Sequence, residues 1–248
     1  MAEALLRVDG LTKSFGALRA TDGIDLEVHE GETLAVIGPN GAGKTTLIGQ
    51  LAGNIRPDAG SIRFGGEDVT GLPAPRRARK GFARSFQITS VFPEFSALEN
   101  VALAVLAQSG RTGFWRPAMK DASLLQPAGE FLRLVGLEAR AQAPAASLSH
   151  GEHRQLEVAM ALAGRPRLLL LDEPMAGMGT DESQRMIELL GTLKRRQTMI
   201  LVEHDMDAVF RLADRIAVLV YGRIIAIGAP EEIRTNAEVR KAYLGEEA

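Results

Sequence analysis

The chain has no cysteine and few aromatic residues. The absence of cysteine excludes disulfide bonds, thiolate zinc sites and a cysteine nucleophile, and it fits a reducing compartment. Long apolar runs are missing as well. The longest one outside the expected strands, residues 101–107, is far shorter than the roughly 20 residues that cross a bilayer. Any role at a membrane therefore has to come through a partner.

An excess of charge of one sign is also missing. The 29 Lys and Arg residues and the 31 Asp and Glu residues leave a net charge of −2. Nonspecific nucleic-acid binding needs a basic field that this chain lacks, so we expect no nucleic-acid partner. Residues 1–9 carry an early acid and no sustained apolar segment. We therefore expect no signal peptide and a cytoplasmic location.

One motif dominates what is present. Residues 38–46 read Gly-Pro-Asn-Gly-Ala-Gly-Lys-Thr-Thr, directly after the apolar run 33–37. The glycines let backbone N–H groups converge where a phosphate can bind at a helix start. In this motif Lys44 reaches the β- and γ-phosphates and Thr45 ligates magnesium. The predicted nucleotide-binding residues are Gly38, Pro39, Asn40, Gly41, Ala42, Gly43, Lys44, Thr45 and Thr46.

The rest of the chain predicts an α/β fold. Short β-like runs between residues 5 and 28 indicate an antiparallel edge sheet, and further strands are expected at 61–64 and 81–87. Residues 95–165 are rich in Ala and Leu at helical spacing, which predicts a helical insertion. Three continuous apolar runs suit strands of a parallel sheet buried on both faces: residues 168–171, 198–202 and 216–220.

Two further features are interpreted as structural. The basic stretch 76–80 is more typical of a solvated helix face than of a phosphate or lipid patch. Trp115, the only tryptophan, is left without a role, because a lone aromatic usually packs.

Two carboxylates follow the strand predicted at 168–171. They are Asp172 and Glu173, at the carboxyl end of the strand, where ligands of open α/β sheets bind. With the phosphate loop upstream, Asp172 is expected to hold magnesium and Glu173 to polarise the attacking water. Without that loop, an acidic turn or helix cap would be the better interpretation.

The segment Leu-Ser-His-Gly-Glu at residues 148–152 precedes a helical stretch. Together with the motifs above, it resembles the ATP-binding-cassette ATPases, whose signature Leu-Ser-Gly-Gly-Gln opens a helix at this place. The resemblance covers essentially the whole chain. It implies that Ser149 and Gly151 bind the γ-phosphate of ATP held by a second subunit. A plain Ser-capped helix is the alternative.

The resemblance assigns three more positions. Gln87 matches the glutamine that contacts magnesium and the attacking water and links the site to a transmembrane partner. His204 matches the switch histidine that touches the γ-phosphate. Phe15 matches the aromatic that stacks on adenine, although a strand-end phenylalanine commonly packs.

The chain departs from the family pattern in two places. The signature has His150 where glycine is usual and Glu152 where glutamine is usual. After Pro174 the chain reads Ala-Gly-Met-Gly instead of Ser-Ala-Leu-Asp, so Gly179 replaces the carboxylate that usually crosses the dimer interface. These departures leave open how two ATP sites would communicate.

Residues 83–87, 176–179 and 222–246 resemble one subfamily, the ATPase subunits of branched-chain amino-acid importers and their relatives for urea and amides. This resemblance implies an ATP- and Mg²⁺-dependent ATPase on the cytoplasmic face of the membrane. Its implied partners are two permease subunits, a second ATPase (a paralogue or a second copy) and, indirectly, an extracytoplasmic binding protein. Residues 88–94, with Phe92 and Phe95, are the predicted permease-docking surface.

The implied organisation is an ATP-binding core of residues 1–87 and 166–248 around a helical subdomain of residues 88–165. The core combines a RecA-like part with the antiparallel β edge sheet. A lipopolysaccharide-export ATPase is the alternative within transport, and a soluble ABC ATPase is the alternative from another class. Soluble members usually carry two cassettes or coiled-coil inserts, which this chain does not show. An inactive cassette is disfavoured because Lys44 and Glu173 are present. The transported solute is not readable from the sequence.

Overall fold

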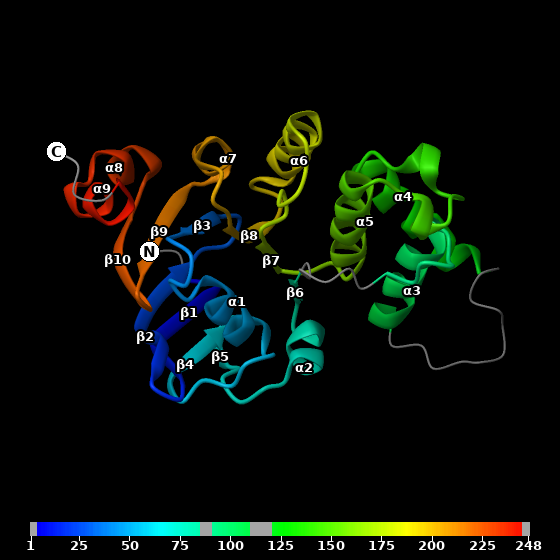
Figure 1. Ribbon diagram of the computed structural model, residues 1–248. Coiled ribbons are helices and arrows are strands. Elements are labelled where there is room, and N and C mark those ends of the chain that lie inside the picture. The colour runs from blue at the N-terminus through cyan, green and yellow to red at the C-terminus, as the bar shows by residue number, and fades with distance from the viewer. Residues whose placement is uncertain (1–3, 85–90, 110–120, 245–248) are drawn as a thin grey trace.

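The computed structural model describes residues 4–84, 91–109 and 121–244, and a six-stranded sheet forms its centre (Figure 1). The strand order is β10-β9-β3-β8-β7-β6, in which β10 is antiparallel to β9 and the other pairs are parallel. Every residue of β3, β7 and β8 is buried, as the apolar runs predicted. The strands are β3 (Thr33–Ile37), β6 (Phe82–Arg84), β7 (Leu168–Asp172), β8 (Thr198–Val202), β9 (Arg215–Val220) and β10 (Arg223–Gly228).

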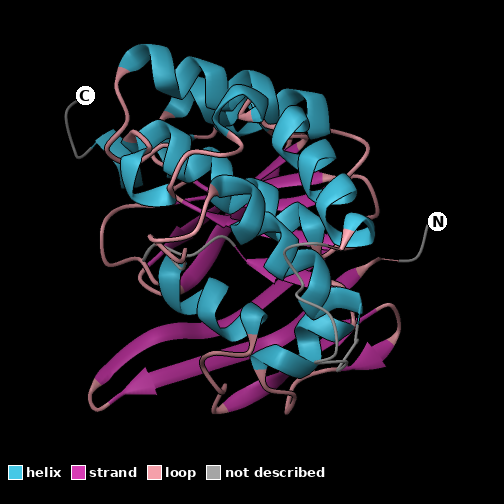
Figure 2. Ribbon diagram, turned by 90° about the vertical axis from the view of Figure 1, so that its right-hand side faces the viewer, coloured by secondary structure: helices cyan, strands magenta, loops and turns pink. Residues whose placement is uncertain are grey.

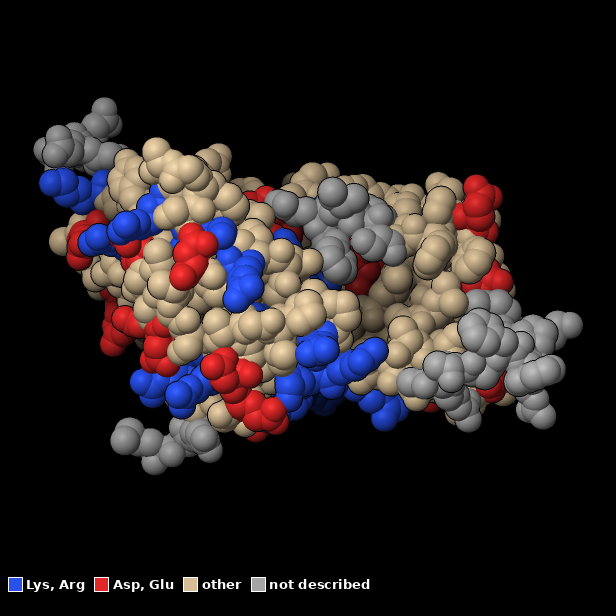
Figure 3. Space-filling model, turned by 90° about the horizontal axis from the view of Figure 1, so that it is seen from below, with Lys and Arg blue, Asp and Glu red and all other residues tan. Residues whose placement is uncertain are grey.

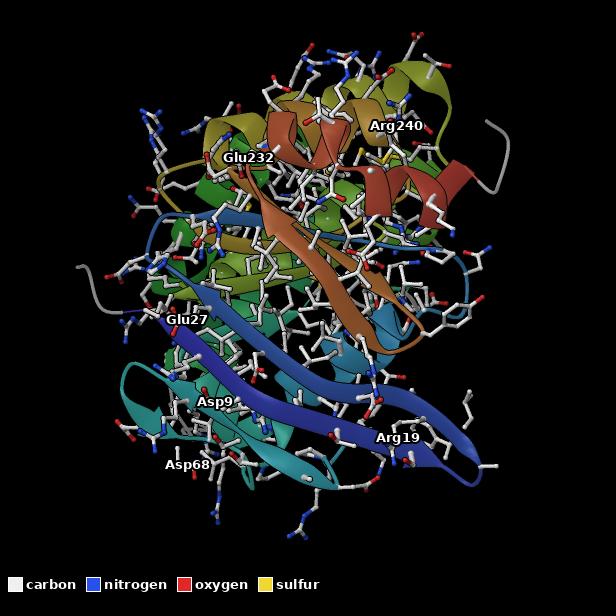
Figure 4. All side chains as sticks on the ribbon, turned by 90° about the vertical axis from the view of Figure 1, so that its left-hand side faces the viewer. Asp9, Arg19, Glu27, Asp68, Glu232 and Arg240 are labelled. Atoms are coloured by element: carbon white, nitrogen blue, oxygen red, sulfur yellow. The ribbon has the colours of Figure 1, made fainter. Side chains whose placement is uncertain are left out.

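The predicted antiparallel edge sheet is present, with the order β2-β1-β4-β5. Its strands are β1 (Leu6–Phe15), β2 (Leu18–Val28), β4 (Ala59–Phe64) and β5 (Glu67–Asp68). Asp9 and Glu27 lie near one end of its long strands, and Arg19 lies near the other (Figure 4). Arg7 forms ion pairs with Asp9 at 2.9 Å and with Glu27 at 3.2 Å. These exposed pairs lie on the outer face, while alternate side chains of β1 pack inward.

The helices fall into two groups (Figure 1). Helices α3 to α5 gather at one end of the molecule and share an apolar core that also includes residues of β7 and α6. The others lie along the sheets, and Figure 2 shows helices stacked above the long antiparallel strands. The helices are α1 (Lys44–Ala52), α2 (Ala74–Arg79), α3 (Ala97–Ser109), α4 (Ala122–Leu134), α5 (His150–Ala163), α6 (Thr180–Leu193), α7 (Met206–Leu212), α8 (Pro230–Thr235) and α9 (Ala237–Leu244), with short 3₁₀ turns at Glu138–Arg140 and Ala145–Ser147.

In the described residues, no helix has the length and apolar character needed to cross a membrane.

The interpretation of residues 76–80 as a solvated helix face is wrong for Arg77, which is only 1% exposed. Its guanidinium donates to four backbone carbonyls, those of Gln50 at 2.7 Å, Leu51 at 2.7 Å, Thr70 at 2.9 Å and Leu72 at 3.0 Å. The first two carbonyls belong to the last turn of α1, where helical carbonyls lack partners and the helix dipole is negative. Burial lowers the pKa of Arg77 to about 10, so the side chain remains a cation at neutral pH. Arg77 therefore caps the helix that follows the phosphate loop.

Replacing Arg77 with Met is expected to lower the free energy of unfolding by about 3 kcal/mol, because four carbonyls lose a buried charged donor. Urea unfolding followed by circular dichroism measures the change. Arg76→Met is the control on the same helix. Arg76 is exposed, so its replacement is expected to change the stability by less than about 0.5 kcal/mol. Equal effects of the two substitutions would contradict the capping role.

Candidate functional site

The phosphate loop connects β3 to α1, and at two of its glycines the neighbouring backbone leaves no room for a side chain. A Cβ atom on Gly38 would lie 2.1 Å from the Leu219 carbonyl oxygen, and one on Gly43 would lie 2.1 Å from the Ala20 carbonyl oxygen. Gly43 has φ 108° and caps α1 without any side-chain hydrogen bond. The first N–H groups of α1 therefore receive no hydrogen bond from an N-cap side chain, and they are available to bind an anion. This arrangement fits the predicted phosphate site.

Lys44 lies across this loop. Its Nζ donates to the Gly38 carbonyl at 2.7 Å and to the Pro39 carbonyl at 3.1 Å. Burial lowers the pKa of Lys44, and the carboxylates of Asp172 and Glu173 oppose that shift. The ammonium therefore lies within electrostatic reach of both acids that the sequence predicted.

Parallel pairing brings several chain segments to one edge of the sheet. The strand order β3-β8-β7-β6 places four carboxyl ends side by side. The phosphate loop leaves β3, His204 follows β8, and Asp172 ends β7. Arg84 ends β6. Residues assigned from separate motifs are thus neighbours at the place where ligands of α/β sheets bind.

Asp172 is fully buried and uses one of its two oxygens. Its Oδ2 accepts a hydrogen bond at 2.9 Å from Nη2 of Arg84, and the Asp172 side chain is 0% exposed. Oδ1 is buried, and no described residue donates to it. Burial raises the pKa of Asp172, while Arg84 acts to lower it. An unpartnered carboxylate oxygen beside a phosphate cradle fits Mg²⁺, which prefers oxygen ligands. Asp172 and the exposed Thr45 are the candidate ligands.

Arg84 belongs to the site through its hydrogen bond to Asp172, but the sequence interpretation assigned it no role. Its segment was expected to form a strand and was noted as a subfamily pattern, without a role for the arginine itself. The strand pairing indicates its place, because Arg84 ends β6, which pairs in parallel with β7 and so brings Arg84 close to Asp172.

Glu173 occupies a left-handed backbone conformation, with φ 50°. Such a conformation costs an L-residue about 1–2 kcal/mol and is often found at functional sites. The Glu173 N–H donates to the Val202 carbonyl at 2.9 Å, which fixes the turn against β8. The strand therefore ends abruptly at the residue expected to polarise water.

A second missed residue, Glu203, connects two loops of the site. Its side chain is 1% exposed. Oε1 accepts from the Met175 N–H at 3.0 Å, and Oε2 accepts from the His204 N–H at 3.1 Å. Burial raises the pKa of Glu203, and these backbone donors oppose the shift. The loops after β7 and β8 are thereby tied together, while the imidazole of His204 stays 65% exposed.

The signature segment starts α5 with a capping box. The Glu152 N–H donates to Ser149 Oγ at 3.2 Å, and the Ser149 N–H donates to Glu152 Oε2 at 2.8 Å. The carboxylate at the fifth signature position thus has a structural role that the sequence interpretation did not assign. A Cβ atom on Gly151 would lie 2.7 Å from Glu182 Oε1, so a larger residue there would have to displace the Glu182 side chain. Figure 1 shows α5 and α1 on opposite sides of β6 and β7.

Two other predicted residues have different outcomes. Phe15 is half exposed at the end of β1, with Lys13 Nζ 5.5 Å from its ring centroid. It is available to a planar ligand, and its stacking role stays a prediction. Gln87 lies outside the described residues.

Replacing Glu203 with Gln is expected to change how stability depends on pH. The pKa of Glu203 is raised above its ordinary value of 4.5, so the folded chain binds this proton more tightly than the unfolded chain. The contribution of Glu203 to stability is therefore largest at low pH and is lost as the pH rises through its folded-state pKa. Urea unfolding from acidic to neutral pH should show the wild type losing stability relative to Glu203→Gln. Parallel curves would contradict this expectation.

Comparison with known proteins identifies the family. A family model described as ABC transporter matches residues 21–176, and one described as branched-chain amino acid ATP-binding cassette transporter matches residues 223–248. The chain is 40% identical over 256 residues to the high-affinity branched-chain amino acid transport ATP-binding protein BraF of Pseudomonas aeruginosa, covering 99% of this chain and 100% of BraF. LivG of Escherichia coli, which carries the same description, is 38% identical over 255 residues, again covering 99% of this chain and 100% of that protein.

Solved structures agree with this match. The ADP conformation of MJ1267, an ATP-binding cassette of an ABC transporter, has a TM-score of 0.87 at 28% identity and covers 99% of this chain and 100% of its own. The predicted α/β fold, with a P-loop core, an antiparallel sheet and a group of helices, is confirmed. The chain belongs to the ATP-binding subunits of ABC transporters, the family that its motifs resemble.

Proposed function

We propose that this chain is the ATP-hydrolysing subunit of an importer for branched-chain amino acids or related small solutes. The observation that carries the proposal is the shared sheet edge, where Lys44, Asp172 and Glu173 interact electrostatically beside an uncapped helix start. The match to BraF and LivG over nearly the whole chain supports the solute class.

Each side chain at this edge has a role in phosphoryl transfer. Lys44 and the N–H groups at the start of α1 hold and neutralise the phosphates. Asp172 and Thr45 hold Mg²⁺, with Gln87 as a further expected ligand. Bound Mg²⁺ supplies positive charge that offsets the developing charge on the phosphoryl oxygens. Glu173 accepts a proton from the attacking water, and His204 contacts the γ-phosphate after β8.

The signature segment supports a nucleotide shared between two subunits. Ser149 starts α5, and Figure 1 shows that helix away from the phosphate loop of the same chain. We infer that Ser149 and Gly151 complete the site of a second ATPase subunit, either a paralogue or a copy of this chain. Hydrolysis then requires the two subunits to close on ATP.

We infer a surface for the permease subunits from a groove in the structure. The groove has a volume of about 470 Å³ and lies between α2 and β6 on one side and α3 and α5 on the other, and its lining combines Ala side chains with polar and larger apolar ones. Figure 3 views this side, where a hollow lies next to Lys and Arg side chains. Phe92 and Phe95 precede α3 and do not line this groove; they are exposed and stacked, with ring centroids 5.4 Å apart. We infer that a permease contacts both the groove and this aromatic pair through a coupling helix, at the cytoplasmic face of the membrane. Residues 88–90 of the expected docking surface lie outside the described residues.

Replacing Glu173 with Gln tests the hydrolytic role. ATP binding, measured with a fluorescent ATP analogue, is expected to stay within a factor of about two, while hydrolysis falls by about 100-fold or more because the general base is lost. Lys44→Ala is the comparison variant, because the loss of the ammonium group that binds the phosphates should weaken ATP binding. Hydrolysis by Glu173→Gln at the wild-type rate would refute the assignment.

Single cysteines at Phe92 and at Phe95 test the docking surface. The natural chain has no cysteine, so each variant carries one reactive thiol. In the complex purified with its membrane partners, a thiol crosslinker is expected to join these positions to a permease subunit. A cysteine at the exposed Glu188 of α6 is the control and should give no such product. If neither Phe position crosslinks to a permease, the docking proposal fails.

A further inference from the structure

Two departures from the family pattern, His150 in the signature and Gly179 in the segment after Pro174, lie in parts of the chain that contact each other. We propose that His150 and Glu182 form a clamp that ties the signature segment to the loop following Glu173 in the same subunit. The clamp links the residue expected to hydrolyse this subunit's ATP with the serine expected to grip the ATP of its partner. This inference rests on the proposed function, and it provides the communication that a carboxylate at position 179 would otherwise supply.

The first contact of the clamp is made by the histidine ring. His150 Nε2 lies 3.0 Å from the Ala176 carbonyl oxygen, within hydrogen-bond distance. The next residue, Gly177, has φ 77°, and a Cβ atom there would lie 3.1 Å from His150 Nε2. The ring thus packs against a position where only glycine fits without a shift. The ring of His150 therefore fits against the backbone at Gly177, where a side chain would crowd it.

The second contact is made by a single carboxylate on α6. Oε1 of Glu182 accepts a hydrogen bond from Ser149 Oγ at 3.3 Å. Oε2 accepts from the Gly179 N–H at 3.4 Å. A side chain at Gly151 would collide with this carboxylate, so the signature backbone packs directly against it. Glu182 therefore contacts the signature serine and the end of the loop at the same time.

The chemistry of these contacts makes the clamp sensitive to a bound phosphate. A serine hydroxyl has one proton to donate, and here Ser149 donates it to Glu182. To donate to a γ-phosphate instead, Ser149 has to give up that bond. The phosphate and the carboxylate also repel each other. Engaging the partner's ATP therefore shifts Glu182, and with it Gly179 at the end of the loop that begins at Glu173.

The variants His150→Phe and Glu182→Gln test the clamp in the full-length chain. His150→Phe keeps a flat ring and removes the hydrogen bond, and Glu182→Gln keeps the shape and removes the charge. Affinity for a fluorescent ATP analogue should stay within twofold of wild type, because the phosphate loop is untouched. The kcat for ATP hydrolysis should fall at least fivefold in each variant with KM within twofold. The two effects on kcat should not multiply in the double variant, since both act through one clamp.

Glu188→Gln is the matched control, because Glu188 lies on the same helix, is exposed and accepts a hydrogen bond from Gln184 one turn earlier. It should leave kcat unchanged. The clamp is refuted if kcat of the His150 and Glu182 variants equals wild type, or if their urea midpoints and nucleotide affinities fall together with kcat, which would indicate a purely structural role. A wild-type chain that does not bind the ATP analogue would refute the proposed function itself, and the binding measurement distinguishes that result from failure of the clamp.

Discussion

The phosphate-loop backbone is confined by the backbone on either side of it, and the site depends on this confinement. A Cβ atom on Gly43 would lie 2.1 Å from the Ala20 carbonyl oxygen of β2. A Cβ atom on Gly38 would lie equally close, 2.1 Å, to the Leu219 carbonyl oxygen of β9. The loop can therefore take few other paths, and α1 begins at a fixed point with its N–H groups directed outward. At the other end of α1, buried Arg77 donates to the last carbonyls. The helix is thus held at both ends, and its dipole points at the phosphate site.

Parallel strand pairing converts separate sequence motifs into one site. β8 lies between β3 and β7, so the loop carrying His204 has the phosphate loop on one side and the Asp172 strand end on the other. Two backbone contacts then fix the loops to each other. Glu203 accepts from Met175 N–H, and the turn at Glu173 donates to β8. These contacts connect the loops that follow β7 and β8 directly to each other.

The sequence predicted the buried strands, the phosphate loop and the acidic pair, because these depend on local patterns with known spacing. It did not predict the burial of Arg77 or Glu203. Arg77 lies in a basic run that looks solvated, and its four acceptors come from other segments of the fold. Arg84 and Glu203 are likewise defined by partners across the sheet edge. The sequence showed Glu152 as a departure from the glutamine usual in the family signature, and its capping of α5 is visible in the helix geometry.

The charges at the site favour the proposed divalent cation. Asp172 and Glu173 lie at the same edge as the phosphate cradle, and Lys44 interacts with both. A polyphosphate would add further negative charge to this edge, where burial already disfavours the ionised form of Asp172. Arg84 neutralises only one carboxylate oxygen and leaves Oδ1 without a described donor. One lysine and one arginine do not balance two carboxylates and a triphosphate, so additional positive charge at Oδ1 would favour the proposed binding of a nucleotide at this edge.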